Sequence, residues 1–172
     1  MIKIGLLSDT HGYLHPRVSD FFSACDEIWH AGDIGNQETA DLLAKMKPFK
    51  AVFGNIDGVT LRQSFREIEI FQCEQMKILM LHIGGYPGKY EPKTRKLIEE
   101  HRPGIFISGH SHILKVIYDK KYQLLHINPG AAGKSGMHKL ITMIRFVIDG
   151  KEIKDLEIFE AKRSNAIDQT NE

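Results

Sequence analysis

Short apolar runs alternate with helical patterns in the first third of the chain, and this alternation restricts the fold more than any other feature. Residues 2–7, 28–30 and 50–53 are predicted strands, whereas residues 13–26 and 37–47 carry apolar side chains at helical spacing. A strand–helix–strand–helix–strand order implies right-handed crossovers and a parallel sheet with helices on its faces. The sequence therefore predicts an α/β fold.

The second half of the chain has the pattern of antiparallel hairpins. Predicted strands pair across turns at residues 68–72 with 76–81, 116–118 with 124–127, and 141–148 with 153–159. Asp149-Gly150 in the last pair is a strong hairpin signal. We expect one domain over residues 1–160, with residues 161–172 as a flexible tail because they have almost nothing to bury.

Composition limits the classes of protein that this chain can belong to. Its 23 Lys and Arg against 22 Asp and Glu give a net charge of +1, which offers no general nucleic-acid surface. No apolar run approaches the ~20 residues that span a bilayer, and no signal segment precedes the first strand. Cys25 and Cys73 lie in apolar patterns and are expected to be buried thiols. We expect a cytoplasmic protein without a membrane partner.

Several predicted strands end in residues of the types that bind metal ions. In open α/β sheets the loops at the carboxyl ends of the strands bind ligands. Carboxylate, amide and imidazole side chains gathered there suit a divalent transition metal better than magnesium. The candidate ligands, each just after a predicted strand, are Asp9, His11, Asp33, Asn55, His82, His110 and His112.

Taken singly, most of these residues also have an ordinary structural interpretation. Asp9 is a plausible helix N-cap, the segment from Asn55 to Asp57 a plausible turn, and His82 a plausible structural histidine. The glycine-rich loop at residues 128–133 fits either a phosphate contact or a wide turn. The segment Gly-His-Ser-His is the most informative, because two imidazoles separated by one residue can face two neighbouring ions.

The ordered set of motifs resembles the calcineurin-like metallophosphoesterases. In chain order it is Asp-x-His, Gly-Asp, Gly-Asn-x-Asp, an isolated His and Gly-His-x-His, between residues 8 and 112. The chain resembles the compact bacterial and archaeal phosphodiesterase branch in its small size, its hairpin-rich second half and its Gly-Asn-Ile-Asp segment. The resemblance implies a four-layer α/β/β/α sandwich of two mixed sheets with a dimetal site at the strand-end loops.

The resemblance also implies how the ligands divide between the two ions. Asp33 would bridge the ions, and the terminal ligands would be Asp9, His11 and His112 for one and Asn55, His82 and His110 for the other. Two cations about 3.5–4 Å apart can hold a phosphoryl group and convert a bridging water to the attacking hydroxide. Manganese is our first choice of metal, with iron, cobalt, nickel and zinc as alternatives.

We therefore expect a metal-dependent phosphodiesterase that acts on a small phosphoester. The sequence does not decide between a monomer and a homo-oligomer. A phosphomonoesterase using the same site is one alternative. The other is a protein-binding scaffold like a subunit of the eukaryotic retromer coat, which shares this fold. Because all seven positions keep ligating side chains, an enzyme is favoured.

The catalytic candidates are Asn55 and Asp57, and the proton donor is not evident. Where the family often has a histidine after the asparagine, this chain has Ile56, which cannot protonate a leaving group. His15 and Asp57 are near enough in sequence to be considered, although a surface histidine and a turn aspartate are their ordinary interpretations. Ile83 follows His82 where the family often has glycine, and no segment identifies a substrate pocket.

Overall fold

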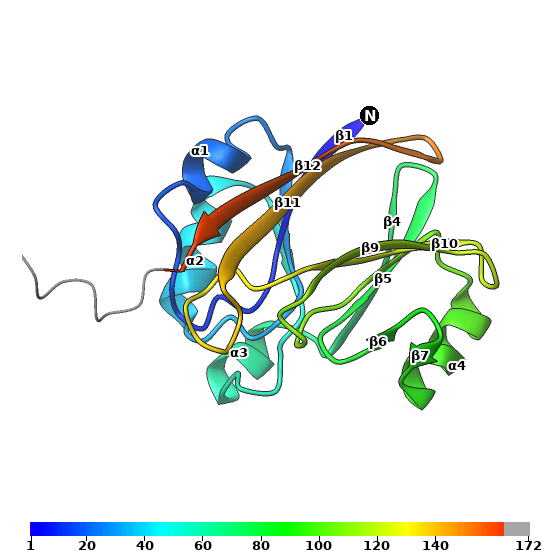
Figure 1. Ribbon diagram of the computed structural model, residues 1–172, viewed down its shortest axis with the longest axis horizontal. Coiled ribbons are helices and arrows are strands. Elements are labelled where there is room, and N and C mark those ends of the chain that lie inside the picture. Colours follow the sequence, from blue (N-terminus) through cyan, green and yellow to red (C-terminus); the bar gives the residue numbers. More distant parts are fainter. Residues whose placement is uncertain (164–172) are drawn as a thin grey trace, which may run out of the picture.

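The computed structural model describes residues 1–163 and arranges them in two five-stranded sheets that pack face to face (Figure 1). The first sheet has the order β12-β11-β1-β2-β3, with β1 Ile2–Leu7, β2 Glu27–His30, β3 Phe49–Ala51, β11 Leu140–Asp149 and β12 Glu152–Lys162. The second has the order β4-β5-β8-β10-β9, with β4 Ile68–Cys73, β5 Met76–Leu81, β8 Ile105–Ile107, β9 Leu114–Asp119 and β10 Leu124–Pro129.

Helices cover the outer faces of both sheets, which gives the predicted α/β/β/α order of layers. Helices α1 (Val18–Phe22) and α2 (Gln37–Met46) lie on the outer side of the first sheet, whereas α4 (Pro92–His101) lies beyond the second (Figure 1). The short α3 (Val59–Ser64) packs its buried Leu61 near Ala40 of α2. A small hairpin of β6 (Gly85–Tyr86) and β7 (Lys89–Tyr90) precedes α4.

The main core fills the space between the two sheets. Ile4 and Trp29 from the first sheet pack in one cluster with Ile78, Met80 and Ile107 from the second, and all five side chains are fully buried. Burial of this kind contributes ~25 cal/mol per Å² of apolar surface. The alternating side chains of each strand therefore divide between this central core and the helix-covered outer faces.

Parallel pairing brings the functional loops to one edge of the sandwich. Strand β1 pairs in parallel with β2, β2 with β3, and β5 with β8. The amide N–H of Gly109, just after β8, donates to the His82 carbonyl just after β5 at 3.0 Å. The carboxyl ends of these strands consequently meet, as the sequence pattern predicted.

Three expectations about the elements need correction. The predicted helix over residues 13–26 is reduced to Val18–Phe22, because the N–H groups of His11 and Gly12 donate to the carbonyls of Asp33 and Ile34 and hold the preceding chain in a loop. Helix α3 and the β6–β7 hairpin were not predicted. Strand β12 continues beyond residue 160 to Lys162, because Ala161 pairs with Ile141. The rest of the predicted tail, residues 164–172, lies outside the described residues.

Two further expectations concern the thiols and the membrane. Cys25 and Cys73 are buried and free, as predicted. Among residues 1–163, no helix has both the length and the apolar character that crossing a bilayer requires.

Candidate metal centre

The loops that carry the candidate ligands have an unusual backbone. Residues other than glycine seldom adopt positive φ, and such residues concentrate at functional sites where the surrounding structure enforces them. Positive φ angles of 47–67° occur at five of the seven candidates: Asp9, His11, Asp33, His110 and His112. Each of these side chains therefore leaves its strand in a direction that an extended backbone would not give.

The β1 and β2 loops are fixed to each other through a buried histidine, His30. The Gly32 N–H donates to His30 Nδ1 at 3.1 Å, and the opposite nitrogen, Nε2, lies 2.9 Å from Thr10 Oγ1. Burial lowers the pKa of His30 to about 4, so the ring is neutral and its Nε2–H can donate to Thr10. Thr10 Oγ1 donates in turn to the Ile34 carbonyl at 2.9 Å. This chain sets the spacing between the loops of Asp9 and Asp33.

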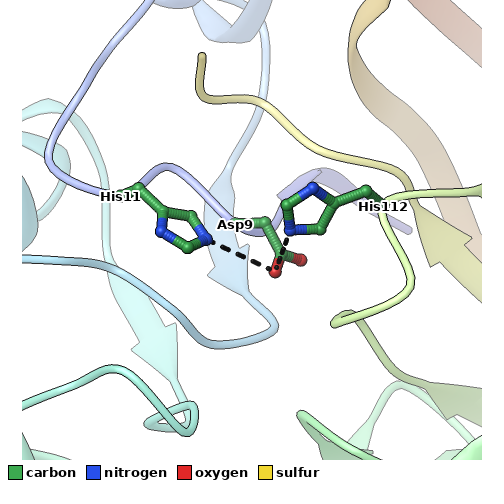
Figure 2. Close-up of side chains that lie close together, drawn as sticks. All are labelled: Asp9, His11 and His112. Atoms are coloured by element: carbon green, nitrogen blue, oxygen red, sulfur yellow. Dashed lines mark ion pairs between the residues drawn. The ribbon is translucent and has the colours of Figure 1, made fainter. Parts of the chain in front are cut away.

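The first ligand cluster contains Asp9, His11 and His112, whose candidate ligand atoms all lie within 4.8 Å of one another. Figure 2 shows both imidazoles directed at the Asp9 carboxylate from opposite sides. His112 Nε2 lies 3.1 Å and His11 Nε2 3.9 Å from Asp9 Oδ1. The other carboxylate oxygen, Asp9 Oδ2, accepts from Ser8 Oγ at 2.6 Å and from the His110 N–H at 3.1 Å, which leaves Oδ1 for the cluster.

The second cluster contains Asp33, His82 and His110, and Asp33 connects it to the first. Asp33 Oδ2 lies 3.2 Å from His82 Nε2 and 3.5 Å from His11 Nε2, although these rings belong to different clusters. His82 Nδ1 lies 2.7 Å from the Ala31 carbonyl, so Nδ1–H donates there and Nε2 keeps its lone pair for the site. One carboxylate oxygen thus lies between the two groups of nitrogen ligands.

Unpaired buried atoms provide a test of whether these residues fit metal ions. Asp9 Oδ1, His11 Nε2 and His82 Nε2 are buried and have no well-oriented hydrogen-bond partner among residues 1–163. Leaving a buried polar atom unpaired costs ~1–3 kcal/mol. A cation at each cluster would satisfy all three atoms, and oxygen and imidazole ligands are the donors that such a cation accepts. The residues fit two divalent ions.

The two carboxylates are present in their ligating, ionised form. Burial by itself raises the pKa of Asp9, but the His11 and His112 rings, which can donate from Nε2 when no ion is bound, outweigh burial, and the pKa lies well below its ordinary value. Burial likewise opposes ionisation of Asp33, but the His82 ring, which can carry a proton on Nε2 when no ion is bound, outweighs burial, so the pKa of Asp33 is also lowered. Both carboxyl groups are therefore charged at neutral pH.

Two glycines allow the ligand loops to approach each other closely. A Cβ atom at Gly54 would lie 2.0 Å from Asp33 Oδ1, and one at Gly109 would lie 2.2 Å from Ser8 Oγ. Both distances are far below van der Waals contact. The glycines before Asn55 and His110 are consequently required by packing.

Asn55 and Asp57 have different surroundings, and this separates their roles. Asn55 is exposed and lines a cavity of about 290 Å³ together with His82 and Arg62. Asp57 is buried, and its carboxylate accepts three backbone N–H groups, from Ile34, Gly35 and Gly54 at 2.8–3.1 Å. The interpretation of Asp57 as a proton donor does not fit this environment. Asp57 joins the Asp33 loop to the Asn55 loop.

His15, the other residue considered for proton transfer, has contacts of its own away from the two clusters, and Ile56 leaves an open position. His15 packs its ring against Phe159, with the ring centroids 5.1 Å apart, and its Nδ1 accepts the Arg17 N–H. Ile56 is 46% exposed, and its N–H donates to Asp33 Oδ1 at 3.0 Å. Its apolar side chain therefore occupies an open position beside the site.

His138 was not predicted, although it contacts a candidate ligand. Its Nε2 donates to the Gly133 carbonyl at 2.8 Å, and its Nδ1 lies 3.1 Å from His112 Nδ1. His138 Nδ1 can therefore accept the proton of His112 Nδ1, which would leave the lone pair of His112 Nε2 free for an ion held together with Asp9. Partners of this kind orient a metal-binding histidine. No motif identified His138, because its sequence position after a glycine-rich loop does not indicate which side chain it meets.

Comparison with known sequences places the chain among phosphoesterases. A family model described as the calcineurin-like phosphoesterase superfamily domain matches residues 2–151. A probable metallophosphoesterase of Methanocaldococcus jannaschii is 35% identical over 134 residues, which cover 74% of this chain and 67% of the relative. A probable metallophosphoesterase of Methanothermobacter thermautotrophicus is 28% identical over 165 residues, 90% of each chain.

Solved structures share the fold at low sequence identity. A novel archaeal phosphodiesterase has a TM-score of 0.70 and 18% identity, with 92% of this chain and all of that chain covered. Vps29 of Entamoeba histolytica complexed with Zn²⁺ has a TM-score of 0.72 and 18% identity, with 95% and 100% covered. Both bear out the four-layer sandwich.

Proposed function

The chain belongs to the calcineurin-like phosphoesterase superfamily, and we propose that it is a metal-dependent phosphodiesterase acting on a small phosphoester. The observation that carries the proposal is the pair of ligand clusters joined by Asp33 at one sheet edge. Two divalent ions, when bound, neutralise phosphoryl charge, orient the phosphoester and make a water molecule nucleophilic at neutral pH.

We assign the ligands as the family pattern implies. The Asp33 carboxylate would serve both ions, and the terminal ligands would be Asp9, His11 and His112 for one and Asn55, His82 and His110 for the other. Of these, Asp9, His11 and His112 form one cluster in the structure, and Asp33, His82 and His110 form the other. Manganese remains the first choice of metal, with iron, cobalt, nickel and zinc as alternatives. Asn55 offers an amide oxygen to an ion and an N–H to a phosphoryl oxygen, so we assign it a catalytic contact as well.

The protein's own contribution is to hold this arrangement ready before substrate arrives. Arg62 of α3 donates from Nε to the Asp57 carbonyl at 2.6 Å and from its other end to the carbonyls of Gly54 and Asn55. Together with the Asp57 carboxylate, these bonds fix the loop that presents Asn55. A rigid supporting shell keeps catalytic groups close to their productive positions.

Purified protein supplied with Mn²⁺ is expected to hydrolyse bis(4-nitrophenyl) phosphate with a higher kcat/KM than 4-nitrophenyl phosphate. One reason is that cavities of about 290 and 210 Å³ adjoin the second cluster, at His82 and at His110, and offer room for two ester groups. The archaeal phosphodiesterase with this fold also supports a diester. A higher kcat/KM for the monoester would make the protein a phosphomonoesterase.

The diesterase activity is expected to depend steeply on the leaving group, because Ile56 stands where a proton donor would otherwise lie. A positioned acid typically contributes ~10²–10⁴-fold. Across a series of aryl phosphodiesters, log kcat/KM should fall sharply as the pKa of the leaving phenol rises. Ile56→His should flatten the slope, since the 46% exposed position has space for an imidazole, whereas Ile56→Leu should not. A shallow slope in the natural protein would reveal another proton donor.

A protein-binding scaffold is the second candidate function, since Vps29 proteins share this fold. One such Vps29 structure holds Zn²⁺, so metal binding alone does not separate the two functions. Hydrolysis does separate them. Two bound ions without turnover of either nitrophenyl ester would favour the scaffold.

A further inference from the structure

Strand β9 forms an outer edge of the second sheet, beside β10 (Figure 1). Among residues 1–163, no strand pairs with its free side. Three consecutive apolar side chains are exposed on this strand: Val116 is 37% exposed, Ile117 39% and Tyr118 58%. An edge strand with exposed apolar side chains is a ready template for pairing with another strand.

The other three sheet edges carry features that hinder such pairing. Strand β3 has only three residues. Strand β12 is rich in charged side chains, and its pairing with β11 is irregular where Asp155 adopts a φ of +53°. Strand β4 exposes no large apolar side chain in the described part of the chain. Short length, charge and irregular pairing all protect an edge, so β9 is the edge left open to a partner.

The pairing of β10 shows which backbone groups of β9 are free. The Leu125 N–H donates to a carbonyl just before β8 at 2.9 Å, and the Ile127 carbonyl accepts an N–H just after β8 at 3.1 Å. Both residues therefore direct their backbone groups away from β9. Their opposite residues on β9 are Tyr118 and Val116, respectively. Because hydrogen bonding alternates along a strand, the N–H and C=O groups of Val116 and Tyr118 point into the open edge.

We propose that β9 pairs antiparallel with β9 of a second copy of this chain, around a two-fold axis at Ile117. Each residue then lies opposite the partner residue that is equally far beyond the axis. Backbone hydrogen bonds join Val116 to the partner's Tyr118, and these are the residues whose N–H and C=O groups are free. The second sheets of the two copies become one continuous sheet.

The side chains of β9 complement themselves in this arrangement. On one face of the sheet, Ile117 packs against the partner's Ile117, and Lys115 lies opposite the partner's Asp119. On the other face, Val116 lies opposite the partner's Tyr118. Apolar pairs and pairs of opposite charge are the cross-strand neighbours that stabilise a sheet, and the two-fold axis repeats each of them.

The neighbouring registers lack this complementarity. With the axis at Val116, Lys115 would lie opposite the partner's Ile117, so a charge would face an apolar side chain. With the axis at Tyr118, Lys115 would lie opposite the partner's Lys121, and like charges directly opposite each other destabilise a sheet. The axis at Ile117 is therefore the register that the sequence of β9 favours. A strand of an unrelated protein has no such built-in match, which makes a second copy the occupant that the edge fits.

The contact consists mainly of one strand from each copy, so its area is small. Interfaces of less than ~1,200 Å² belong to weak and transient complexes. We expect a dissociation constant in roughly the micromolar range. This inference does not rest on the proposed function, because it concerns only the edge of the second sheet.

Sedimentation velocity between ~1 and ~500 µM chain tests the dimer. The natural protein should change from monomer to dimer over this range. Ile117→Lys places two ammonium groups opposite each other at the axis and should raise the dissociation constant by ~10-fold or more. The matched control is Ile158→Lys, an isoleucine on the edge strand β12 that is 44% exposed, and it should keep the dimer. Circular dichroism checks that both variants are folded.

A cysteine at the axis tests the register and does not require an added charge. Residues opposite each other at a position without backbone hydrogen bonds have Cα atoms ~4.5 Å apart, a separation that a disulfide can bridge. Ile117→Cys should therefore give a covalent dimer when it is oxidised with glutathione disulfide and analysed without reductant. Ile158→Cys is the matched control and should stay monomeric. The natural cysteines are both buried and do not interfere.

Three results would overturn the proposal. The first is a monomer at every concentration, which would leave β9 as an edge for a strand of another protein. The second is a dimer that Ile117→Lys does not weaken and that Ile117→Cys does not cross-link. The third is a dimer lost in Ile158→Lys and kept in Ile117→Lys, which would place the interface at β12. If Ile117→Lys does not fold, cross-linking through Ile117→Cys decides the question alone.

Discussion

Removal of bound metal is expected to reduce phosphodiester hydrolysis by on the order of 10³-fold or more, because metal ions supply several kcal/mol of transition-state stabilisation. Asp9 Oδ1, His11 Nε2 and His82 Nε2 would return to being unpaired buried atoms. The measurement is kcat/KM for bis(4-nitrophenyl) phosphate after dialysis against a chelator, followed by titration with Mn²⁺.

Activity should return after two equivalents of Mn²⁺ per chain, counted by elemental analysis. Mg²⁺ serves as the control ion, since imidazole ligands favour transition metals. Full activity in protein with only trace metal would contradict the dimetal assignment. Saturation at one equivalent would show that one of the two clusters does not hold an ion.

Asp33→Asn is expected to lower kcat/KM by more than ~100-fold. Loss of a group that only orients a ligand typically costs ~10–100-fold, and Asp33 is proposed to contact both ions. The substitution is nearly isosteric. Its amide oxygen can still accept the Ile56 N–H, as Asp33 Oδ1 does at 3.0 Å, while an NH₂ group replaces Oδ2 between His11 and His82. The change therefore acts on the bridging position and leaves the loop intact.

Two comparison variants make the Asp33 result specific. His112→Ala removes a ligand of one cluster only, so it should cost less activity than Asp33→Asn. Asp41→Asn changes an exposed aspartate on α2 and should leave activity unchanged. Bound metal is counted in each variant, because loss of the bridge should lower occupancy at both sites. Equal small losses in Asp33→Asn and His112→Ala would show that Asp33 does not bridge.

The sequence by itself determined which residues stand at the ends of the strands. A short apolar run such as residues 2–7 predicts a strand whose side chains are buried on both faces of the sheet. Parallel pairing of such strands then places their carboxyl ends at one edge of the sheet. Short hairpin turns such as Asp149-Gly150 are local, so β11 and β12 were predictable as a pair. The four-layer order came from the family resemblance, which fixes how two such sheets stack.

Elements with weak local signals could not be predicted. Helix α3 has six residues and β6 and β7 have two each, so neither periodicity nor length distinguishes them from loops. The start of α1 is also decided at long range, because Gly12 donates to the carbonyl of Ile34 rather than entering a helix.

Only the tertiary structure decided which side chains face each other within the site. Asp57 follows Asn55 closely in sequence, yet its carboxylate turns to backbone N–H groups while Asn55 faces a cavity beside His82. His138 meets His112 for the same reason. The partner of each side chain depends on how loops distant in sequence pack together, and on the left-handed backbone angles that this packing enforces. The spacing of residues along the sequence encodes neither the packing nor the angles.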